Sequence, residues 1–158
     1  MKPYAIMISV PFQRHANPFV HVTIKLASKS FAITFVHIEY AHHRISKSHN
    51  NTSCSNEFDV FSEARDSGLD IRYTTIANGF PLEFDRVQNL NEYWESILHE
   101  FPSHVDEFIG NLIESSDPSL LSFLVADPLY PWSSTIAKKY KLVNVAFWTG
   151  PAVLLAIS

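Results

Sequence analysis

PFQRHANP, residues 11–18, joins a strand-like apolar run to a helix-like one and places a histidine at the joint. Asparagine is a common helix N-cap, and proline suits the first helical position, where its missing N–H would have no partner. We therefore expect Asn17 to cap a helix over residues 18–29, with His15 just outside its N-terminus. The positive helix end and the neighbouring Arg14 would favour the neutral imidazole, which accepts protons. His15 is thus a candidate general base, although a lone histidine in a turn is more often an ordinary surface or structural residue.

Strand-like and helix-like segments alternate along the chain. Nearly continuous apolar runs, typical of strands buried on both faces of a parallel sheet, occur at residues 4–10, 31–37, 70–76, 120–126 and 142–147. Helices are expected between them at residues 18–29, 58–65, 89–115 and 132–140. The opening strand, helix and strand predict a right-handed parallel crossover. We predict an α/β fold with a Rossmann-like, doubly wound parallel sheet of strand order 3-2-1-4-5.

Composition limits the classes of function. The chain has 158 residues, 46% of them hydrophobic and 13% aromatic, which suits one domain with a substantial core rather than a disordered chain. Its net charge of −4 and the lack of a long basic run argue against a nucleic-acid partner. The single cysteine, Cys54, excludes an internal disulfide and favours a reducing compartment, which we take to be the cytoplasm. No apolar run approaches the roughly 20 residues that cross a bilayer, so we expect no membrane insertion.

The polar segment at residues 39–57 contains His42, His43 and His49. Adjacent histidines point in different directions on a helix, and no carboxylate or cysteine falls at ligand spacing. We therefore expect a solvated surface segment rather than a metal site.

Residues 89–115 carry an apolar and aromatic stripe at helical spacing, which predicts either core packing or, less often, a pocket wall. Pro102 must interrupt the hydrogen-bond ladder, so two helical pieces or a kink are expected near Phe101.

Asp127 follows the fourth predicted strand, just as His15 follows the first. In the predicted order these strands are neighbours, and ligands of such sheets bind beyond the carboxyl ends of the strands where the winding reverses. A carboxylate bonded to one ring nitrogen of His15 would fix the tautomer and stabilise the imidazolium formed when the other nitrogen takes a proton. The alternative is that Asp127, which precedes Pro128, merely caps a turn or helix.

Three other chemistries find little support. The loop after the first strand lacks the glycines of a dinucleotide fingerprint. The chain contains neither the G-x-S-x-G elbow of serine hydrolases nor a phosphate-binding G-x-x-x-x-G-K-[ST] loop.

Three segments resemble plant family-1 UDP-sugar-dependent glycosyltransferases, most closely their subgroup 86A. Residues 11–18 are similar to the family's acceptor-side motif, which has proline, two or three residues, Gly-His, two residues and proline. Residues 124–127, followed by Trp132, resemble the second catalytic segment, and residues 147–151 resemble the segment after the fifth strand. The likeness covers essentially the whole chain.

The resemblance implies a GT-B glycosyltransferase of which residues 1–158 form an incomplete N-terminal, acceptor-binding domain without the C-terminal UDP-sugar-binding domain. In the family the histidine matching His15 deprotonates an acceptor hydroxyl, which attacks the anomeric carbon of the UDP-sugar with inversion. The aspartate matching Asp127 supports the histidine, and the threonine matching Thr149 touches the sugar. The acceptor is a small hydrophobic metabolite, and neither a metal nor another cofactor is implied beside the UDP-sugar, for which we expect UDP-glucose.

Two departures from the family accompany the match. Arg14 stands where glycine normally precedes the histidine, and it could obstruct a substrate or point into solvent. Ser30 stands where glycine commonly precedes the second strand.

Phe12, Phe80 and Trp148 are further candidates for the surroundings of the acceptor or sugar, because each lies in or beside a loop predicted at the carboxyl edge. Residues 151–157 read as an apolar helix that is cut short, so we expect a truncated domain that is inactive alone. The alternative function is a non-catalytic small-molecule-binding or interaction module derived from a glycosyltransferase. Under both interpretations, the enzyme fragment and the non-catalytic module, we expect UDP-sugar to bind only if the C-terminal domain is supplied.

Overall fold

A five-stranded parallel sheet with the order β3-β2-β1-β4-β5 forms the centre of the computed structural model. The structure describes residues 2–10, 13–38, 60–76, 88–115 and 121–149, and everything below refers to these. Its elements, in chain order, are β1 (Tyr4–Ile8), α1 (Gln13–Ser28), β2 (Ala32–Ile38), α3 (Ser62–Asp66), β3 (Ile71–Ile76), α4 (Leu90–His99), α5 (Phe101–Ser115), β4 (Leu121–Ala126), α6 (Ser133–Lys139) and β5 (Val143–Ala146). The predicted fold class and strand order are confirmed.

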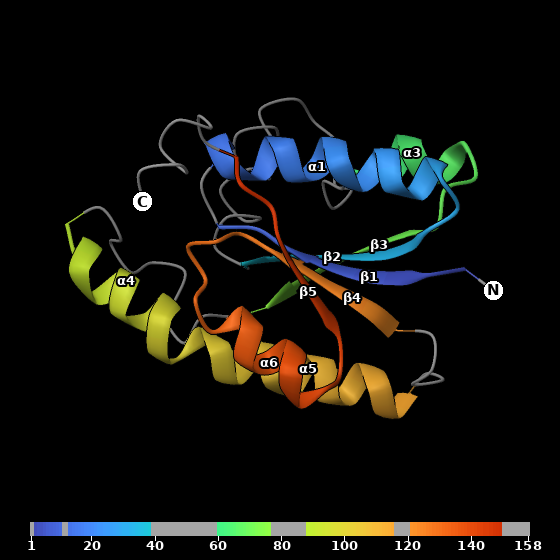
Figure 1. Cartoon of the computed structure of the whole chain (residues 1–158). Helices are drawn as coiled ribbons and strands as arrows, with labels where there is room; N and C mark the ends of the chain where they lie inside the picture. The colour runs from blue at the N-terminus through green and yellow to red at the C-terminus, as the bar shows by residue number, and fades with distance from the viewer. Residues whose placement is uncertain (1, 11–12, 39–59, 77–87, 116–120, 150–158) are drawn as a thin grey trace.

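β1 lies in the middle of the sheet, between β2 and β4. Its side chains alternate between two layers, as the period of two along a strand requires. Ile6 and Ile8 belong to one core cluster with residues of α4 and α5, whereas Met7 belongs to another with Phe19 of α1. Figure 1 shows the corresponding layers, with α1 and α3 on one face of the sheet and α4, α5 and α6 on the other.

α1 begins earlier than the sequence predicts. It starts at Gln13, so His15 lies in its first turn and not outside it, and Asn17 and Pro18 lie within the helix rather than at its start. Ala16 and Phe19, three residues apart, are both buried, so the burial of this helix face begins before Pro18. This burial offsets the backbone hydrogen bond that Pro18 cannot make.

The interruption predicted near Phe101 is confirmed. α4 ends at His99 and α5 starts at Phe101, with Pro102 in its first turn. Most of the predicted stripe faces the core, and Ile97, Phe101 and Val105 are fully buried. Leu90, at the start of α4, is instead 47% exposed.

Three helices end in the same way before the strands that follow them. The N–H groups of Phe31, Leu69 and Leu142 each donate to the carbonyl five residues earlier, at 3.2, 3.2 and 2.8 Å. This is the Schellman arrangement, in which the residue before the apolar one has a positive φ. Ser30, Gly68 and Lys141 have φ values of 69°, 97° and 57°.

Several expectations lie outside the described residues: the polar segment at 39–57 with its histidines, the loop that carries Phe80 and the helix at 151–157. Within the described residues, none of the helices combines the length and the apolar character that crossing a bilayer requires.

Candidate active site at the carboxyl edge of the sheet

The ends of β1, β4 and β5 are tied together by backbone hydrogen bonds. The N–H of Asp127 donates to the carbonyl of Ile8 at 3.3 Å, and the N–H of Phe147 donates to the carbonyl of Ala126 at 3.0 Å. The residues that follow these strands therefore lie at one edge, as expected for parallel strands.

Asp127 is buried, with 1% of its surface exposed. Its Oδ1 accepts a hydrogen bond from the N–H of Leu129 at 3.0 Å, and its carbonyl accepts one from the N–H of Tyr130 at 2.9 Å. Asp127 therefore caps the turn that Pro128 begins, as the turn-cap interpretation predicts. A carboxylate offers about four acceptor sites, so capping through one oxygen is compatible with a second role.

Tyr130 and Trp132 hold this turn against the rest of the molecule. The Tyr130 hydroxyl donates to the carbonyl of Ser9 at 3.0 Å, and the Trp132 indole N–H donates to the carbonyl of Ile97 at 3.1 Å. The centroids of the two rings are 4.8 Å apart, and both rings pack on Phe101. Trp132 was predicted only as part of a motif, and Tyr130 was not predicted at all. The one signal for Tyr130 in the sequence is its place close to Trp132, after a strand and a proline.

Burial raises the pKa of Tyr130 well above its usual value, and the nearby Tyr93 and Asp127 raise it further. The hydroxyl therefore keeps its proton, and Tyr130 remains a hydrogen-bond donor at neutral pH.

The helix that carries His15 starts at the same edge. Phe19, one turn after His15, packs edge-to-face on Phe147, with ring centroids 5.0 Å apart. His15 itself lies in the first turn of α1. Its side chain, like that of Arg14, lies outside the described residues, so the pairing of His15 with Asp127 stays a prediction.

Trp148 and Thr149 follow β5 at this edge and are partly buried. Phe12 and Phe80 lie outside the described residues. The part of the chain that the structure describes holds no group of three or more potential metal ligands.

A second histidine, His37, is the second-to-last residue of β2, so it lies near the same edge of the sheet but on the other side of β1. It is buried in β2, and its Nδ1 lies 3.3 Å from the hydroxyl of Tyr73 on β3. Because β2 and β4 flank β1 on opposite sides, His37 is poorly placed to pair with Asp127.

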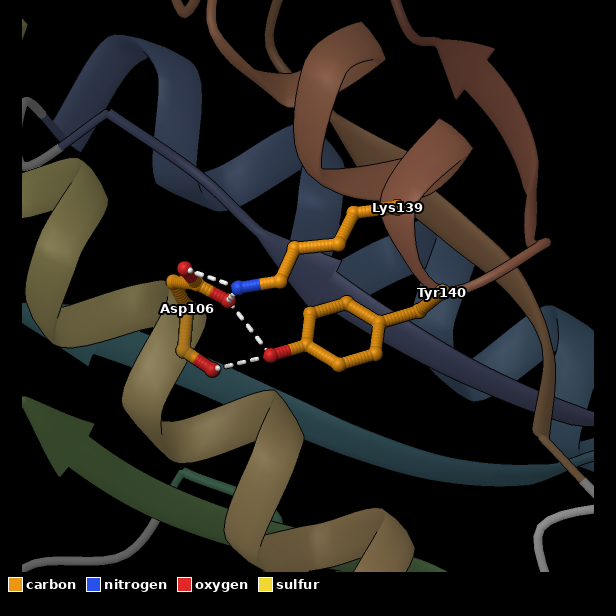
Figure 2. A network of polar contacts seen from close by, with 3 residues as sticks. All are labelled: Asp106, Lys139 and Tyr140. Atoms are coloured by element: carbon orange, nitrogen blue, oxygen red, sulfur yellow. Dashed lines mark hydrogen bonds and ion pairs between the residues drawn. The ribbon is translucent and has the colours of Figure 1, made fainter.

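A charged network lies at the other end of α6. Figure 2 shows Lys139 and Tyr140 reaching across to Asp106 of α5. Nζ of Lys139 lies 3.0 and 2.8 Å from the carboxylate oxygens of Asp106, and the Tyr140 hydroxyl oxygen lies 2.5 Å from Oδ1 of that carboxylate and 3.1 Å from the Asp106 carbonyl oxygen. These bonds, first Lys139 and then Tyr140, lower the pKa of Asp106. The network joins α5 to α6 and is separate from the candidate site.

Two curated plant proteins are similar along nearly the whole chain. UDP-glycosyltransferase 86A1 of Arabidopsis thaliana is 50% identical over 155 residues, which are 98% of this chain and 31% of the relative. UDP-glycosyltransferase 86A2 of the same plant is 40% identical over 98% of this chain and 30% of its own length. The chain thus spans about a third of the relatives it matches. No protein-family profile matches it.

Solved structures show the same fold. The crystal structure of UDP-glucose: anthocyanidin 3-O-glucosyltransferase in complex with UDP matches with a TM-score of 0.68 at 17% identity, over 99% of this chain and 32% of that one. Such neighbours are GT-B glycosyltransferases, in agreement with the predicted fold. The predicted resemblance to subgroup 86A is likewise confirmed. Along 98% of its length the chain is therefore similar to plant UDP-glycosyltransferases of subgroup 86A, of which it spans about a third.

Proposed function

We propose that this chain supplies the acceptor-binding half of an inverting UDP-glycosyltransferase. The enzyme would transfer a sugar, which we take to be glucose, from a UDP-sugar to a hydroxyl of a small hydrophobic metabolite. The observation that carries the proposal is the 50% identity to UDP-glycosyltransferase 86A1 over 98% of the chain. The single cysteine supports a cytoplasmic setting.

His15 is the general base of the proposed reaction. One ring nitrogen takes the proton of the acceptor hydroxyl while its oxygen forms a bond to the anomeric carbon. The bond from that carbon to the UDP oxygen breaks, and UDP leaves with the electron pair. Attack opposite the leaving group inverts the anomeric configuration.

Asp127 orients His15 and stabilises its imidazolium form. The position of Asp127 next to the last residue of β1 supports this role, since the chain runs from there to the first turn of α1. A buried carboxylate interacts more strongly with a nearby positive charge than an exposed one.

We assign Thr149 to contact with the sugar, and Trp148, Phe12 and Phe80 to the surroundings of the acceptor or sugar. Thr149 and Trp148 follow directly after β5, at the carboxyl edge of the sheet, and this position supports the roles assigned to these two residues. Arg14 would lie beside the reacting groups.

In this proposal, binding of the UDP-sugar donor requires a domain that corresponds to the remaining two thirds of the relatives, which this chain does not cover. Much of the barrier to group transfer is lowered by holding donor and acceptor together. The 158 residues alone should therefore give no measurable turnover.

The test compares the 158-residue chain with a chimera that continues into the C-terminal part of UDP-glycosyltransferase 86A1. Both are incubated with UDP-glucose and a panel of flavonoid, terpenoid and phenolic acceptors. We expect turnover by the chimera alone, with a β-configured product by NMR. His15→Gln should lower its kcat by about 100-fold or more, as expected for loss of a general base.

His21→Gln is the matched control, because His21 lies exposed on the same helix. It should leave turnover unchanged. Full activity in the His15→Gln chimera would refute the base assignment. Comparable turnover by the 158-residue chain would refute the division of labour, and acceptor binding by an inactive chimera would favour a non-catalytic module.

A further inference from the structure

We propose that Tyr130 and Trp132 are positioning residues that set the place of the Asp127 carboxylate relative to His15. The proposal rests on the proposed function, in which Asp127 and His15 act together. It goes beyond that function because neither ring needs to touch a substrate.

Tyr130 connects the Asp127 turn to the strand that leads to His15. Its hydroxyl donates to the carbonyl of Ser9 at 3.0 Å, and Ser9 directly follows β1. Both Tyr130 and Ser9 are almost completely buried, so this bond is shielded from competing water. The bond therefore joins the two chain segments that carry the proposed pair, although they are 121 residues apart in sequence.

Trp132 connects the same turn to the opposite layer. Its indole N–H donates to the carbonyl of Ile97 at 3.1 Å, close to the point where α4 gives way to α5. Carbonyls at a helix end need partners from outside the helix, which the indole supplies. The ring also packs on Phe101, the first residue of α5, with centroids 5.7 Å apart.

The turn between these anchors leaves Asp127 little freedom. Its N–H is bonded to Ile8, its Oδ1 to Leu129 and its carbonyl to Tyr130. Movement of Tyr130 would therefore be passed to the Asp127 backbone through a single short turn.

The test measures the pKa of His15 by NMR in the 158-residue chain, with the signal assigned by its loss in His15→Gln. Asp127→Asn keeps an oxygen that can cap Leu129 but removes the charge. It should lower the pKa of His15 by about 1 unit, because a nearby carboxylate favours imidazolium. Tyr130→Phe and Trp132→Phe keep a packed ring but lose the donor, and each should lower the same pKa by about 0.3 unit or more, since the interaction weakens with distance.

Tyr140→Phe is the matched control. It also removes a tyrosine hydroxyl that donates to a backbone carbonyl, here that of Asp106 at 3.1 Å, but at the other end of α6. It should leave the pKa of His15 unchanged to within about 0.1 unit, since a distant neutral group exerts little field.

The outcomes separate the two proposals. No change in Asp127→Asn would overturn the pairing with His15, and the positioning role with it. A lowered pKa in Asp127→Asn, with no change in Tyr130→Phe and Trp132→Phe, would overturn the positioning role alone. An equal change in the pKa of His15 in Tyr140→Phe would also overturn the positioning role, because the change would then reflect a general loss of rigidity in the fold. If Tyr130→Phe does not fold, Trp132→Phe decides by the same criterion.

Discussion

Ser30, Gly68 and Lys141 occupy equivalent positions at three helix ends, yet only one of them is glycine. All three have a positive φ. A side chain at such a position is strained by about 1 kcal/mol or more, whereas glycine is not. The departure noted in the sequence at Ser30 therefore has a physical meaning, because the family's glycine would relieve strain there.

Ser30→Gly should raise the free energy of unfolding by about 0.5–1 kcal/mol, because the relieved strain exceeds the added freedom of the unfolded chain. Urea unfolding followed by circular dichroism measures the change. Ser28→Gly is the control: the same replacement at the last residue of α1 should destabilise. Equal effects at both positions would contradict the explanation.

Gly68→Ala tests the same conformation in reverse. A Cβ added at Gly68 would meet nothing within 4 Å, so any loss comes from the backbone and not from a clash. We expect the free energy of unfolding to fall by about 1 kcal/mol, measured in the same urea titration. An unchanged stability would show that the positive φ carries no penalty here.

At the scale of the elements, α5 and α6 meet through Gly110 and Tyr140. A Cβ added at Gly110 would lie 3.1 Å from the Tyr140 hydroxyl oxygen. Alanine at position 110 would thus have two opposing effects on stability. Its higher helix propensity would stabilise α5, whereas its Cβ would displace the Tyr140 hydroxyl.

Gly110→Ala should stabilise by about 0.5–1 kcal/mol when Tyr140 is already phenylalanine, because the close contact is gone and only the propensity gain remains. In the unmodified chain the same replacement should be neutral or destabilising. A double-mutant cycle from thermal unfolding measures the difference, which we expect to be about 0.5 kcal/mol or more. Additive effects would rule out the contact.

The Asp106 network gives the packing of α5 on α6 a pH dependence. The pKa of Asp106 is lowered in the folded chain, so its stabilising effect is present above the pKa of the unfolded chain, about 3.9, and is lost as the pH falls through the lower folded value. The pKa of Lys139 is raised, so its effect is present below about 10.4 and is lost as the pH rises through the higher folded value.

The difference in unfolding free energy between the unmodified chain and Asp106→Asn should therefore be steady from about pH 5 to 9 and shrink toward pH 2, in keeping with that pKa shift. Urea titrations at several pH values measure it. Because Lys139 is largely exposed, added salt should also reduce the difference. A difference that persists at pH 2 would show that the ionised carboxylate does not stabilise the fold.

Sequence patterns predicted the elements better than the contacts between them. Apolar runs marked the five strands of the described sheet, most clearly β1 and β2, which are buried almost throughout. The strand order was predicted from the doubly wound topology and not from the runs themselves. The start of α1 was misjudged because Asn17 and Pro18 carry the local signature of a helix start, whereas burial of Ala16 outweighs it.

The site was predicted only as far as its edge of the sheet. The strand order placed Asp127 beside β1, as the bond from its N–H to Ile8 shows. The role of Tyr130 in holding the turn could not be read from the sequence, because its partner is a backbone carbonyl 121 residues away, and such a partner leaves no mark on residue types.

For the molecule as a whole, β5 forms one edge of the described sheet and pairs only with β4 within it. All four of its residues are exposed, and Val143 and Val145 keep 56% and 39% of their surface accessible. Exposed apolar edge strands promote pairing between chains.

Val143→Lys should reduce self-association of the chain while changing the free energy of unfolding by no more than about 0.5 kcal/mol, as is usual for surface positions. Light scattering over a concentration series measures association. Leu90→Lys replaces a similarly exposed apolar side chain on α4 and should have a smaller effect. Equal effects of both replacements would assign association to general hydrophobicity rather than to the edge.

The central position of β1 also bears on how the chain emerges from the ribosome. β1 can pair with β2 once residue 38 is available, but its other edge must wait for β4, which begins at Leu121. At about 5–20 residues per second, translation of the roughly 80 residues between them leaves that edge unpaired for several seconds. In a nascent chain the backbone groups on that side of β1 would stay unpaired for this interval, and the edge would be open to pairing with other chains.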